Sequence, residues 1–209
     1  MSDKSATRSK AELRAAALSA RDKLSGKHRA SAALALAKRG LPFEIKQGNI
    51  VSGYSPIRSE IDPAPLMQAL AAQGARLALP AVLARGKSLV FRAWSPNDRL
   101  MLGPLGILEP SPGASELIPD IMLVPLAAFD RLGHRIGYGA GHYDYTLSHL
   151  RSQTPAHFRK TEIKPVIAIG LAFAAQEIKA VPALSHDVAL DYVLTEKKVF
   201  DCRIAARSS

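Results

Sequence analysis

The sequence predicts an α/β fold: a single-domain, three-layer αβα sandwich around an open, mixed and mostly parallel sheet. Strand-like and helix-like segments alternate between residues 49 and 80, as they do where helices cover a sheet. Two continuous apolar runs, at 120–128 and 166–173, are typical of strands covered on both faces. An alternating segment at 88–94 follows the turn Arg85-Gly86-Lys87 and predicts an antiparallel hairpin partner. Such an open sheet is Rossmann-like.

The composition favours one globular domain over residues 1–209. Hydrophobic residues make up 47% of the chain and charged residues 22%, which is the balance of a chain that buries a core. The single cysteine, Cys202, excludes an internal disulfide, and no Cys or His spacing indicates a zinc site. The longest apolar stretches reach about half the ~20 residues of a membrane span. We therefore expect a cytoplasmic protein without a membrane partner; a mitochondrial transit peptide is a weaker alternative, because Asp3 and Glu12 interrupt the basic N-terminus.

The net charge of +10 lies mostly at the N-terminus, where residues 1–46 carry +7. A basic zone of this kind can bind nucleic acid, an anionic membrane face or a small polyanion such as a nucleotide. The charge alone does not distinguish among these three kinds of partner.

Two helices are predicted before the first strand. The first runs from Ser9 to Leu24, because apolar residues recur there at helical spacing, and a basic stripe lies beside them. The basic stripe consists of Lys10, Arg14 and Arg21. The second helix, 27–39, ends at Gly40, a usual C-cap residue. Residues 1–8 are expected to be flexible.

The remaining elements follow from the same patterns. A strand is predicted at 49–54, a helix at 64–73 before Gly74, a strand at 76–80 and a last short strand at 191–195. Residues 96–119 are rich in Pro and Gly and are interpreted as an irregular connection that could cover a site. Residues 197–209 are expected to form a tail.

A glycine-rich loop lies between the two apolar runs. Tight turns are possible at the three glycines of this loop, Gly137, Gly139 and Gly141. The helix predicted at about 141–150 would point its free N–H groups at the loop, and such an arrangement favours the binding of phosphate. Glycines in this spacing also occur in plain flexible turns. A dinucleotide site is disfavoured, since the first acid after the next strand is Glu177, and no G-K-[ST] of a Walker A loop follows.

The segment from Asp130 to Asp144 resembles D-x-x-G-x-R-[LI]-G-x-G-x-G-[YF]-Y-D, the signature of 5-formyltetrahydrofolate cyclo-ligases. Further short matches occur in family order, so that the resemblance covers about residues 9–196. They are Lys10-x-x-x-Arg14, Tyr54 with Ser59-Glu60-Ile61-Asp62, Leu79-Pro80, Gly106 to Pro110, and Val181-Pro182 with His186-Asp187.

The resemblance implies a single cyclo-ligase domain that uses ATP as co-substrate and Mg²⁺ to convert 5-formyltetrahydrofolate into 5,10-methenyltetrahydrofolate. The formyl oxygen is phosphorylated, N10 attacks the activated carbon, and phosphate leaves with ADP already released. Such chemistry requires the protein to position the two substrates and to supply cations around the phosphoryl group. The substrate is a folate, polyglutamylated forms included, and the protein is expected to be a monomer with no nucleic-acid partner.

Catalytic roles fall to Lys10, Arg135 and Asp144. Lys10 and Arg14 lie one helical turn apart and can reach one phosphate group, although a solvated basic face is the plainer alternative. The resemblance assigns the ATP contacts to Lys10, Arg14, Arg135, Gly137, Gly139, Ala140, Gly141, His142 and Tyr143.

Asp144 and Asp187 are the predicted magnesium ligands. Mg²⁺ is typically held by one or two carboxylates together with phosphate and water. Asp144 also falls near the start of a predicted helix, where capping is the alternative role for a carboxylate.

The folate contacts implied are Ser55, Glu60, Tyr138, Gly139 and His142. Glu60 could accept N–H donors from the pterin ring, with an exposed turn acid as the alternative. Trp94 and Phe91 could form an aromatic wall for the pterin, but core packing is the favoured use of at least one of them. The family usually has Tyr or Phe where this chain has His142, a planar ring that can still stack or hydrogen-bond.

Two other functions remain open at this point. The basic N-terminal helix could belong to a nucleic-acid-binding module, which would leave the glycine loop without a role. A nucleotide-dependent α/β enzyme acting on another substrate is the nearer alternative.

Overall fold

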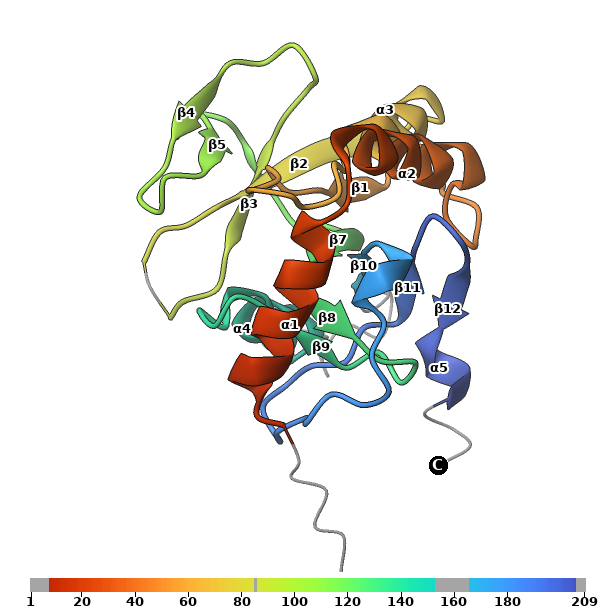
Figure 1. Cartoon of the computed structure of the whole chain (residues 1–209). Helices are drawn as coiled ribbons and strands as arrows, with labels where there is room; N and C mark the ends of the chain where they lie inside the picture. Colours follow the sequence, from red (N-terminus) through yellow and green to blue (C-terminus); the bar gives the residue numbers. More distant parts are fainter. Residues whose placement is uncertain (1–7, 85, 153–165, 206–209) are drawn as a thin grey trace, which may run out of the picture.

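The computed structural model describes residues 8–84, 86–152 and 166–205, and a mixed sheet runs through it (Figure 1). Its strands are β1 (Ile50–Ser52), β2 (Arg76–Ala81), β3 (Val90–Ala93), β6 (Glu116–Leu117), β7 (Ile121–Pro125), β10 (Ile167–Leu171), β11 (Tyr192–Leu194) and β12 (Val199–Asp201). Their order across the sheet is β12-β11-β10-β7-β1-β2-β3-β6. The five strands from β11 to β2 are parallel, and antiparallel strands flank them. The predicted mixed, mostly parallel sheet is confirmed.

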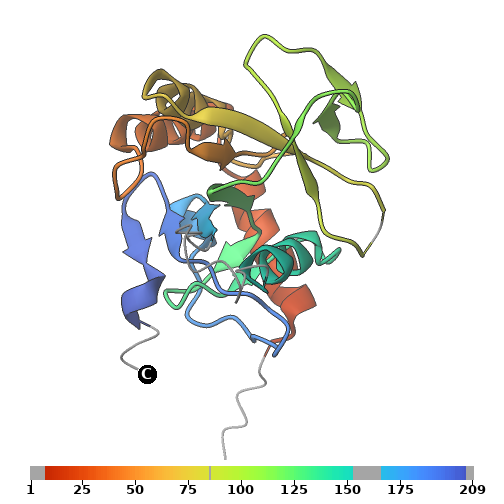
Figure 2. The same cartoon turned by 180° about the vertical axis from the view of Figure 1, so that it is seen from behind.

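Helices cover both faces of the sheet, as Figures 1 and 2 show from opposite sides. On one face, α2 (Gly26–Arg39) and α3 (Ala64–Ala72) pack in an apolar cluster with β1, β7 and β10. On the other face, Leu147 of α4 (His142–Ser152) and Cys202 of α5 (Cys202–Ala205) join a second cluster that includes Met122 and Val124. The helices and sheet form the expected αβα layers.

Helix α1 (Lys10–Asp22) stands apart from these layers. It begins with a capping box in which Ser9 accepts from the Glu12 amide and Glu12 accepts from the Ser9 amide. Its apolar side packs on the hairpin of β8 (Ala128–Phe129) and β9 (Arg135–Ile136), and it contacts η1 (Ala174–Gln176). The basic side of α1 is thereby held near the loop that follows β9.

Two predictions made from the sequence are wrong. Residues 96–119 are not irregular, because β4 (Leu100–Leu102) and β5 (Leu108–Pro110) form a hairpin and β6 pairs with β3. These strands are only two or three residues long, too short to show a periodic pattern among Pro and Gly. The expected tail from 197 onwards instead supplies β12 and α5, while its last residues, 206–209, lie outside the described part.

Apart from Arg8, the segment expected to be flexible at 1–8 lies outside the described residues, as does Arg85 of the predicted turn. The hairpin predicted around that turn is confirmed, because β2 and β3 pair antiparallel. Within the described residues, no helix combines the length and apolar character needed to cross a membrane.

The strand order creates a switch point beside β1. The chain leaves β1 for β2 on one side, and β7 pairs with β1 on the other. In open α/β sheets, ligands bind in the crevice at the carboxyl ends of strands where the order reverses in this way. The segments that follow β1, β2 and β7 are therefore where a site is expected.

Candidate functional site

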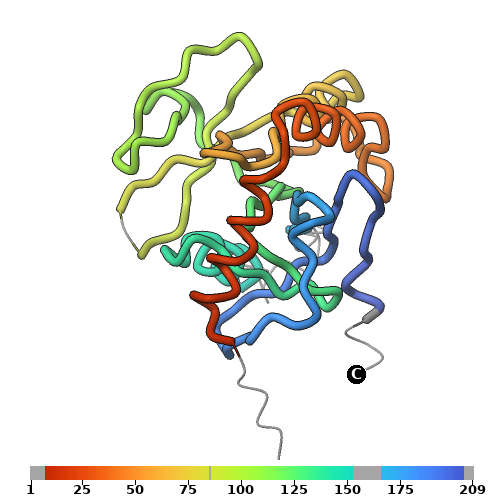
Figure 3. Tube along the Cα trace, viewed as in Figure 1, coloured from red at the N-terminus to blue at the C-terminus, as the bar shows by residue number. Residues whose placement is uncertain are grey.

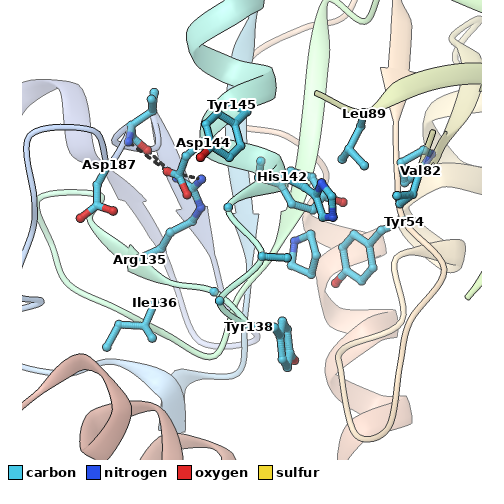
Figure 4. A pocket seen from close by; sticks show the side chains of 18 of the residues that line it. Tyr54, Val82, Leu89, Arg135, Ile136, Tyr138, His142, Asp144, Tyr145 and Asp187 are labelled. Atoms are coloured by element: carbon cyan, nitrogen blue, oxygen red, sulfur yellow. Dashed lines mark hydrogen bonds and ion pairs between the residues drawn. The ribbon is translucent and has the colours of Figure 1, made fainter. Parts of the chain in front are cut away.

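A pocket of about 770 Å³ opens at this switch point (Figure 4). Tyr54 and Ser55 line it from the end of β1, Val82 from the end of β2 and Pro125 from β7. The loop after β9, the first turns of α1 and α4, the β4–β5 hairpin and the 184–188 segment form further parts of the wall. Figure 4 separates two ends: Arg135, Asp144 and Asp187 lie at one, and Tyr54, Val82 and Leu89 at the other. We call them the charged end and the aromatic end.

The glycine loop joins β9 to α4 and borders both ends. Gly139 (φ 98°) and Gly141 (φ 69°) lie in the left-handed region that favours glycine, whereas Gly137 does not. The first backbone bond of α4 runs from the Tyr145 amide to the Gly141 carbonyl at 3.0 Å. The amides ahead of Tyr145 therefore have no carbonyl partner within the helix, as at every helix start. This is the arrangement that favours a phosphate group.

Two cations of α1 reach this loop and the segment behind it. Arg14 Nε donates to the Gly137 carbonyl at 2.6 Å, and Lys10 Nζ pairs with Asp187 Oδ2 at 2.5 Å. Figure 3 shows the start of α1 beside the segment that carries Asp187, although the two are far apart in sequence. Both predicted phosphate-binding cations thus line the pocket next to the glycine loop.

Arg135 is buried at the charged end, only 7% exposed. Its guanidinium donates to Asp144 Oδ1 at 2.8 Å and to the Val188 carbonyl. Burial lowers the pKa of Arg135, and the neighbouring Asp144 carboxylate opposes that shift; arginine nonetheless stays protonated in proteins. The result is a fixed positive charge on the pocket wall.

The two predicted magnesium ligands both lie near Arg135 at the charged end (Figure 4). Both hydrogen bonds described for Asp144, from Arg135 and from the Val188 amide, fall on Oδ1, so the carboxylate does not cap its own helix. Asp187 accepts from Lys10 and from the Leu184 amide through Oδ2 alone. Burial works to raise the pKa of Asp187, but the Lys10 ammonium and the Leu184 N–H outweigh it and hold that pKa below its usual value. Asp144 Oδ2 makes no described hydrogen bond, and Asp187 Oδ1 lies 4.0 Å from His186 Nε2.

These donors fit a magnesium ion that also binds phosphate. Mg²⁺ prefers carboxylate oxygens and usually takes one or two of them, with water and phosphate completing its shell. Among the described residues, no three Asp, Glu, His or Cys side chains are grouped to hold a metal alone.

Near the aromatic end, Glu60 is buried and lines the pocket together with Tyr138. The Ile57 amide donates to Glu60 Oε2 at 2.8 Å. Burial raises the pKa of Glu60, whereas the neighbouring Tyr138 hydroxyl, the Ile57 amide and the Arg21 charge work against the rise. An exposed turn acid, the alternative role, does not describe this residue.

His142 is also buried, with 8% of its surface exposed, and it lines the pocket. Its Nδ1 lies 3.0 Å from the Lys87 carbonyl, which fixes Nδ1 as the donor, while Nε2 makes no hydrogen bond within the described structure. Thr146 accepts from the Leu89 amide at 2.8 Å. The first turns of α4 thus hold the 87–89 segment against the pocket in a way that Phe at position 142 could not.

The other folate candidates are placed less directly. Ser55 lines the pocket, but its hydroxyl donates to the Leu108 carbonyl of β5 at 2.6 Å and so ties β1 to the hairpin. Core packing, the favoured use of at least one of Trp94 and Phe91, is confirmed for Phe91, and neither residue lines the pocket. Tyr54, Tyr138 and Tyr143 supply the aromatic surface instead.

Sequence reasoning missed several residues of this site. Leu105, Ile107 and Glu109 of the β4–β5 hairpin line the pocket, as a segment covering a site would. Arg21 lies one layer behind the wall and is 1% exposed, although it shares a stripe with Lys10 and Arg14. No periodicity could separate it from a solvated arginine, since only the packing of α1 against the 55–60 segment buries it.

Comparisons with known proteins agree with this architecture. The family model described as the 5-formyltetrahydrofolate cyclo-ligase family matches residues 6–196. A 5-formyltetrahydrofolate cyclo-ligase from Mycolicibacterium smegmatis is 35% identical over 91% of this chain and 95% of its own length. The Escherichia coli K12 cyclo-ligase is 29% identical over 75% of this chain and 83% of its own.

Solved structures show the same fold. The 5,10-methenyltetrahydrofolate synthetase of Aquifex aeolicus superposes with a TM-score of 0.74, at 29% identity and with 93% of both chains covered. The corresponding protein of Mycoplasma pneumoniae, at 21% identity and a TM-score of 0.66, supports the fold alone. The family match over nearly the whole chain and these relatives show that the chain belongs to the 5-formyltetrahydrofolate cyclo-ligase family.

Proposed function

We propose that this chain converts 5-formyltetrahydrofolate into 5,10-methenyltetrahydrofolate at the expense of ATP, with Mg²⁺, and releases ADP and phosphate. The observation that carries the proposal is a single pocket whose charged end holds cations, two carboxylates and a glycine loop, and whose other end is aromatic. An enzyme that phosphorylates a ring-bearing substrate needs these two environments side by side. The names of the relatives supply the substrate.

ATP binding is assigned to the charged end. The amides at the start of α4 and the positive end of its dipole favour the phosphate chain, and Lys10, Arg14 and Arg135 add three positive charges around it. The backbone of Gly137, Gly139, Ala140, Gly141, His142 and Tyr143 supplies the rest of the cradle. In this assignment Lys10 exchanges its Asp187 partner for a phosphate oxygen.

Asp144 and Asp187 would hold magnesium, since the described hydrogen bonds of each carboxylate fall on one oxygen. When bound, Mg²⁺ neutralises charge on the phosphate chain and orients it. Arg135 would keep Asp144 in place through its hydrogen bond to Asp144 Oδ1.

The folate is assigned to the aromatic end, where Glu60, Tyr138, Gly139, His142 and Ser55 meet the ring system. An ionised Glu60 can accept N–H donors of the pterin, and the tyrosine rings offer flat surfaces for it. The polar contacts fix orientation, while the aromatic surface supplies most of the buried area.

The reaction follows from this juxtaposition. The formyl oxygen attacks the γ-phosphorus of ATP, and the bond to ADP breaks. N10 then attacks the activated formyl carbon, loses its proton and closes the ring, and the carbon–oxygen bond breaks to release phosphate. The chain contributes positioning and positive charge where the phosphoryl oxygens carry negative charge, which explains why no nucleophilic side chain is required.

We also propose that the chain acts as a cytoplasmic monomer and accepts polyglutamylated folates. Cys202 is a buried free thiol, which suits a reducing compartment, and the net charge of +10 favours anionic substrates. Size-exclusion chromatography tests the monomer, and KM values for folates of increasing glutamate length test the preference.

The direct test of the activity is spectroscopic. The purified protein is incubated with 5-formyltetrahydrofolate, ATP and Mg²⁺, and the near-ultraviolet absorbance of the methenyl product is followed. A rise that requires both ATP and Mg²⁺ is expected. Absence of an ATP-dependent rise rejects the proposed function.

A further inference from the structure

Arg21 is a buried cation that the proposed reaction does not use. Only 1% of the residue is exposed, although it lies on a helix whose other cations face the pocket. A buried charge is costly unless it is paired and hydrogen-bonded. Arg21 is also absent from the pocket lining, so it does not contact ligand in the way that Lys10 and Arg14 can.

Its hydrogen bonds lead to the pocket wall. Arg21 Nε donates to Ser59 Oγ at 3.0 Å, and Nη1 donates to the Tyr138 hydroxyl at 2.5 Å. Its Nη2 is buried without a hydrogen-bond partner in the described part of the chain. The guanidinium also lies 5.8 Å from the Tyr138 ring centroid. Arg21 is therefore placed immediately behind Tyr138.

This contact fixes the direction of the Tyr138 proton. A guanidinium donates and never accepts, so the Tyr138 oxygen must act as acceptor toward Arg21. The single phenolic proton is then free for another neighbour, and Glu60, whose pKa Tyr138 works to lower, lines the same pocket wall. An ionised Glu60 can only accept, so with that form the order Arg21, Tyr138, Glu60 has one consistent set of donors and acceptors.

The positive charge near Glu60 also favours the ionised form of its carboxyl group. The titratable groups that face it are Arg21 from α1, Tyr138 from the glycine loop, Tyr54 after β1 and Tyr143 of α4. Burial raises the pKa of all three tyrosines, which leaves them neutral, so Arg21 supplies the positive charge in this set. Burial of Glu60 favours its protonated form, and Arg21 opposes that preference.

We propose that Arg21 is a positioning residue for folate: it holds the Tyr138 hydroxyl with its proton free for Glu60, and it places a positive charge behind the carboxylate that accepts the N–H donors of a pterin ring. The inference rests on the proposed function, because it assumes that Glu60 receives the folate. Arg21 itself touches neither substrate.

The test compares Arg21→Gln, Arg21→Lys and the matched control Arg29→Gln. Arg29 is a partly buried arginine of α2 whose guanidinium donates to the Leu24 carbonyl, away from the pocket lining. For each protein, KM for 5-formyltetrahydrofolate, KM for ATP and kcat are measured from acid to neutral pH. Circular dichroism and thermal unfolding check the fold.

Arg21→Gln is expected to raise the folate KM at neutral pH about tenfold, the effect of losing one charge-assisted contact. It should also move the acid limb of the folate profile to higher pH and leave the ATP KM unchanged. Arg21→Lys, which keeps the charge, should restore most of the loss, and Arg29→Gln should behave as the parent. A purely structural role would raise both KM values together without moving the pH profile, and that result overturns the proposal.

Tyr138→Phe keeps the test valid if Arg21→Gln fails to fold, because it removes the bridging hydroxyl while leaving α1 intact. The same shift of the folate profile to higher pH is expected, and an unmoved profile overturns the proposal. Titration of the Glu60 carboxyl carbon by ¹³C NMR in the ligand-free protein separates the two claims. Failure of the parent to turn over rejects the proposed function, whereas an active parent whose Glu60 titrates unchanged in Arg21→Gln or Tyr138→Phe rejects the role of Arg21.

Discussion

At the scale of single residues, the charged end of the pocket is arranged as pairs that a ligand can reorganise. Lys10 with Asp187 and Arg135 with Asp144 each join a cation to a carboxylate. In such pairs each charge compensates the other, and in the proposed reaction phosphate and Mg²⁺ would replace these partners. The pairs keep the cations and carboxylates in place before ligand arrives.

Asp144→Asn tests the metal-ligand role. The amide can still accept from the Val188 N–H, but it loses the charge that pairs with Arg135 and with Mg²⁺. We expect kcat to fall about a hundredfold or more, with the fold retained by circular dichroism. Asp98→Asn is the control, because Asp98 only accepts from the Ser95 amide in an exposed turn. Full activity in Asp144→Asn would remove this residue from the site.

The pH dependence of folate binding follows from Glu60. Burial raises the pKa of Glu60 above the ordinary glutamate value, so the carboxylate takes up a proton at a higher pH than an exposed glutamate would. If the ionised form binds folate, KM for folate must rise as the pH falls through that pKa. Steady-state kinetics against pH measure this rise. Glu60→Gln should bind folate weakly, with a KM that does not change with pH. A parent profile as flat as that of Glu60→Gln would separate Glu60 from folate binding.

At the scale of elements, the turn from β9 into α4 determines where the proposed phosphate cradle lies. Gly139 adopts φ 98°, a conformation that side chains rarely adopt. The sequence motif marks three glycines alike, but only two of them have positive φ. The positive φ angles, and not the presence of glycine alone, identify Gly139 and Gly141 as the positions that shape the loop.

Gly139→Ala is expected to distort this loop. The left-handed conformation costs an alanine about 1 to 2 kcal/mol, so the loop should relax and the ATP KM should rise severalfold. Gly48→Ala is the matched control, since Gly48 has φ 83° and open space around it, but lies at the amino end of β1. Both variants should show a similar decrease in the free energy of unfolding in urea, and only Gly139→Ala should weaken ATP binding. Equal ATP KM values in the two variants would contradict the assignment of this loop.

The contact of β1 with α3 gives a second prediction at this scale. A Cβ on Gly53 would lie 2.1 Å from Met67 Sδ, within a packed core. Gly53→Ala should therefore lower the free energy of unfolding by about 1 to 3 kcal/mol and displace Tyr54, which follows it in the pocket wall. In a Met67→Ala background the same change should cost much less, as a double-mutant cycle in urea would measure. Equal costs in both backgrounds would refute the close approach.

At the scale of the whole molecule, the sequence predicted the sheet well and the site in part. Long periodic or continuously apolar segments gave α1, α2, β7 and β10, because burial on one or two faces leaves a pattern. The short strands β4, β5, β6 and β12 left none, since their pairing is set by distant partners. The motif located the glycine loop, but the aromatic wall and the burial of Arg21 depend on packing between segments far apart in sequence.

The order of the strands explains why these distant segments meet. The ends of β1, β2 and β7 open on one crevice, α1 folds back beside β8 and β9, and the β4–β5 hairpin closes the other side (Figure 1). Ligands of open α/β sheets bind at such a switch point because loops diverge there and leave room. The central claim is therefore that this crevice holds ATP and folate together.

A crystal structure of the chain with Mg²⁺, 5-formyltetrahydrofolate and a non-hydrolysable ATP analogue tests that claim most directly. The account predicts the triphosphate within hydrogen-bonding distance of Lys10, Arg14 and the amides of residues 139–143, with the pterin ring on Glu60. A nucleotide bound elsewhere, or a triphosphate remote from Lys10 and Arg14, would contradict it.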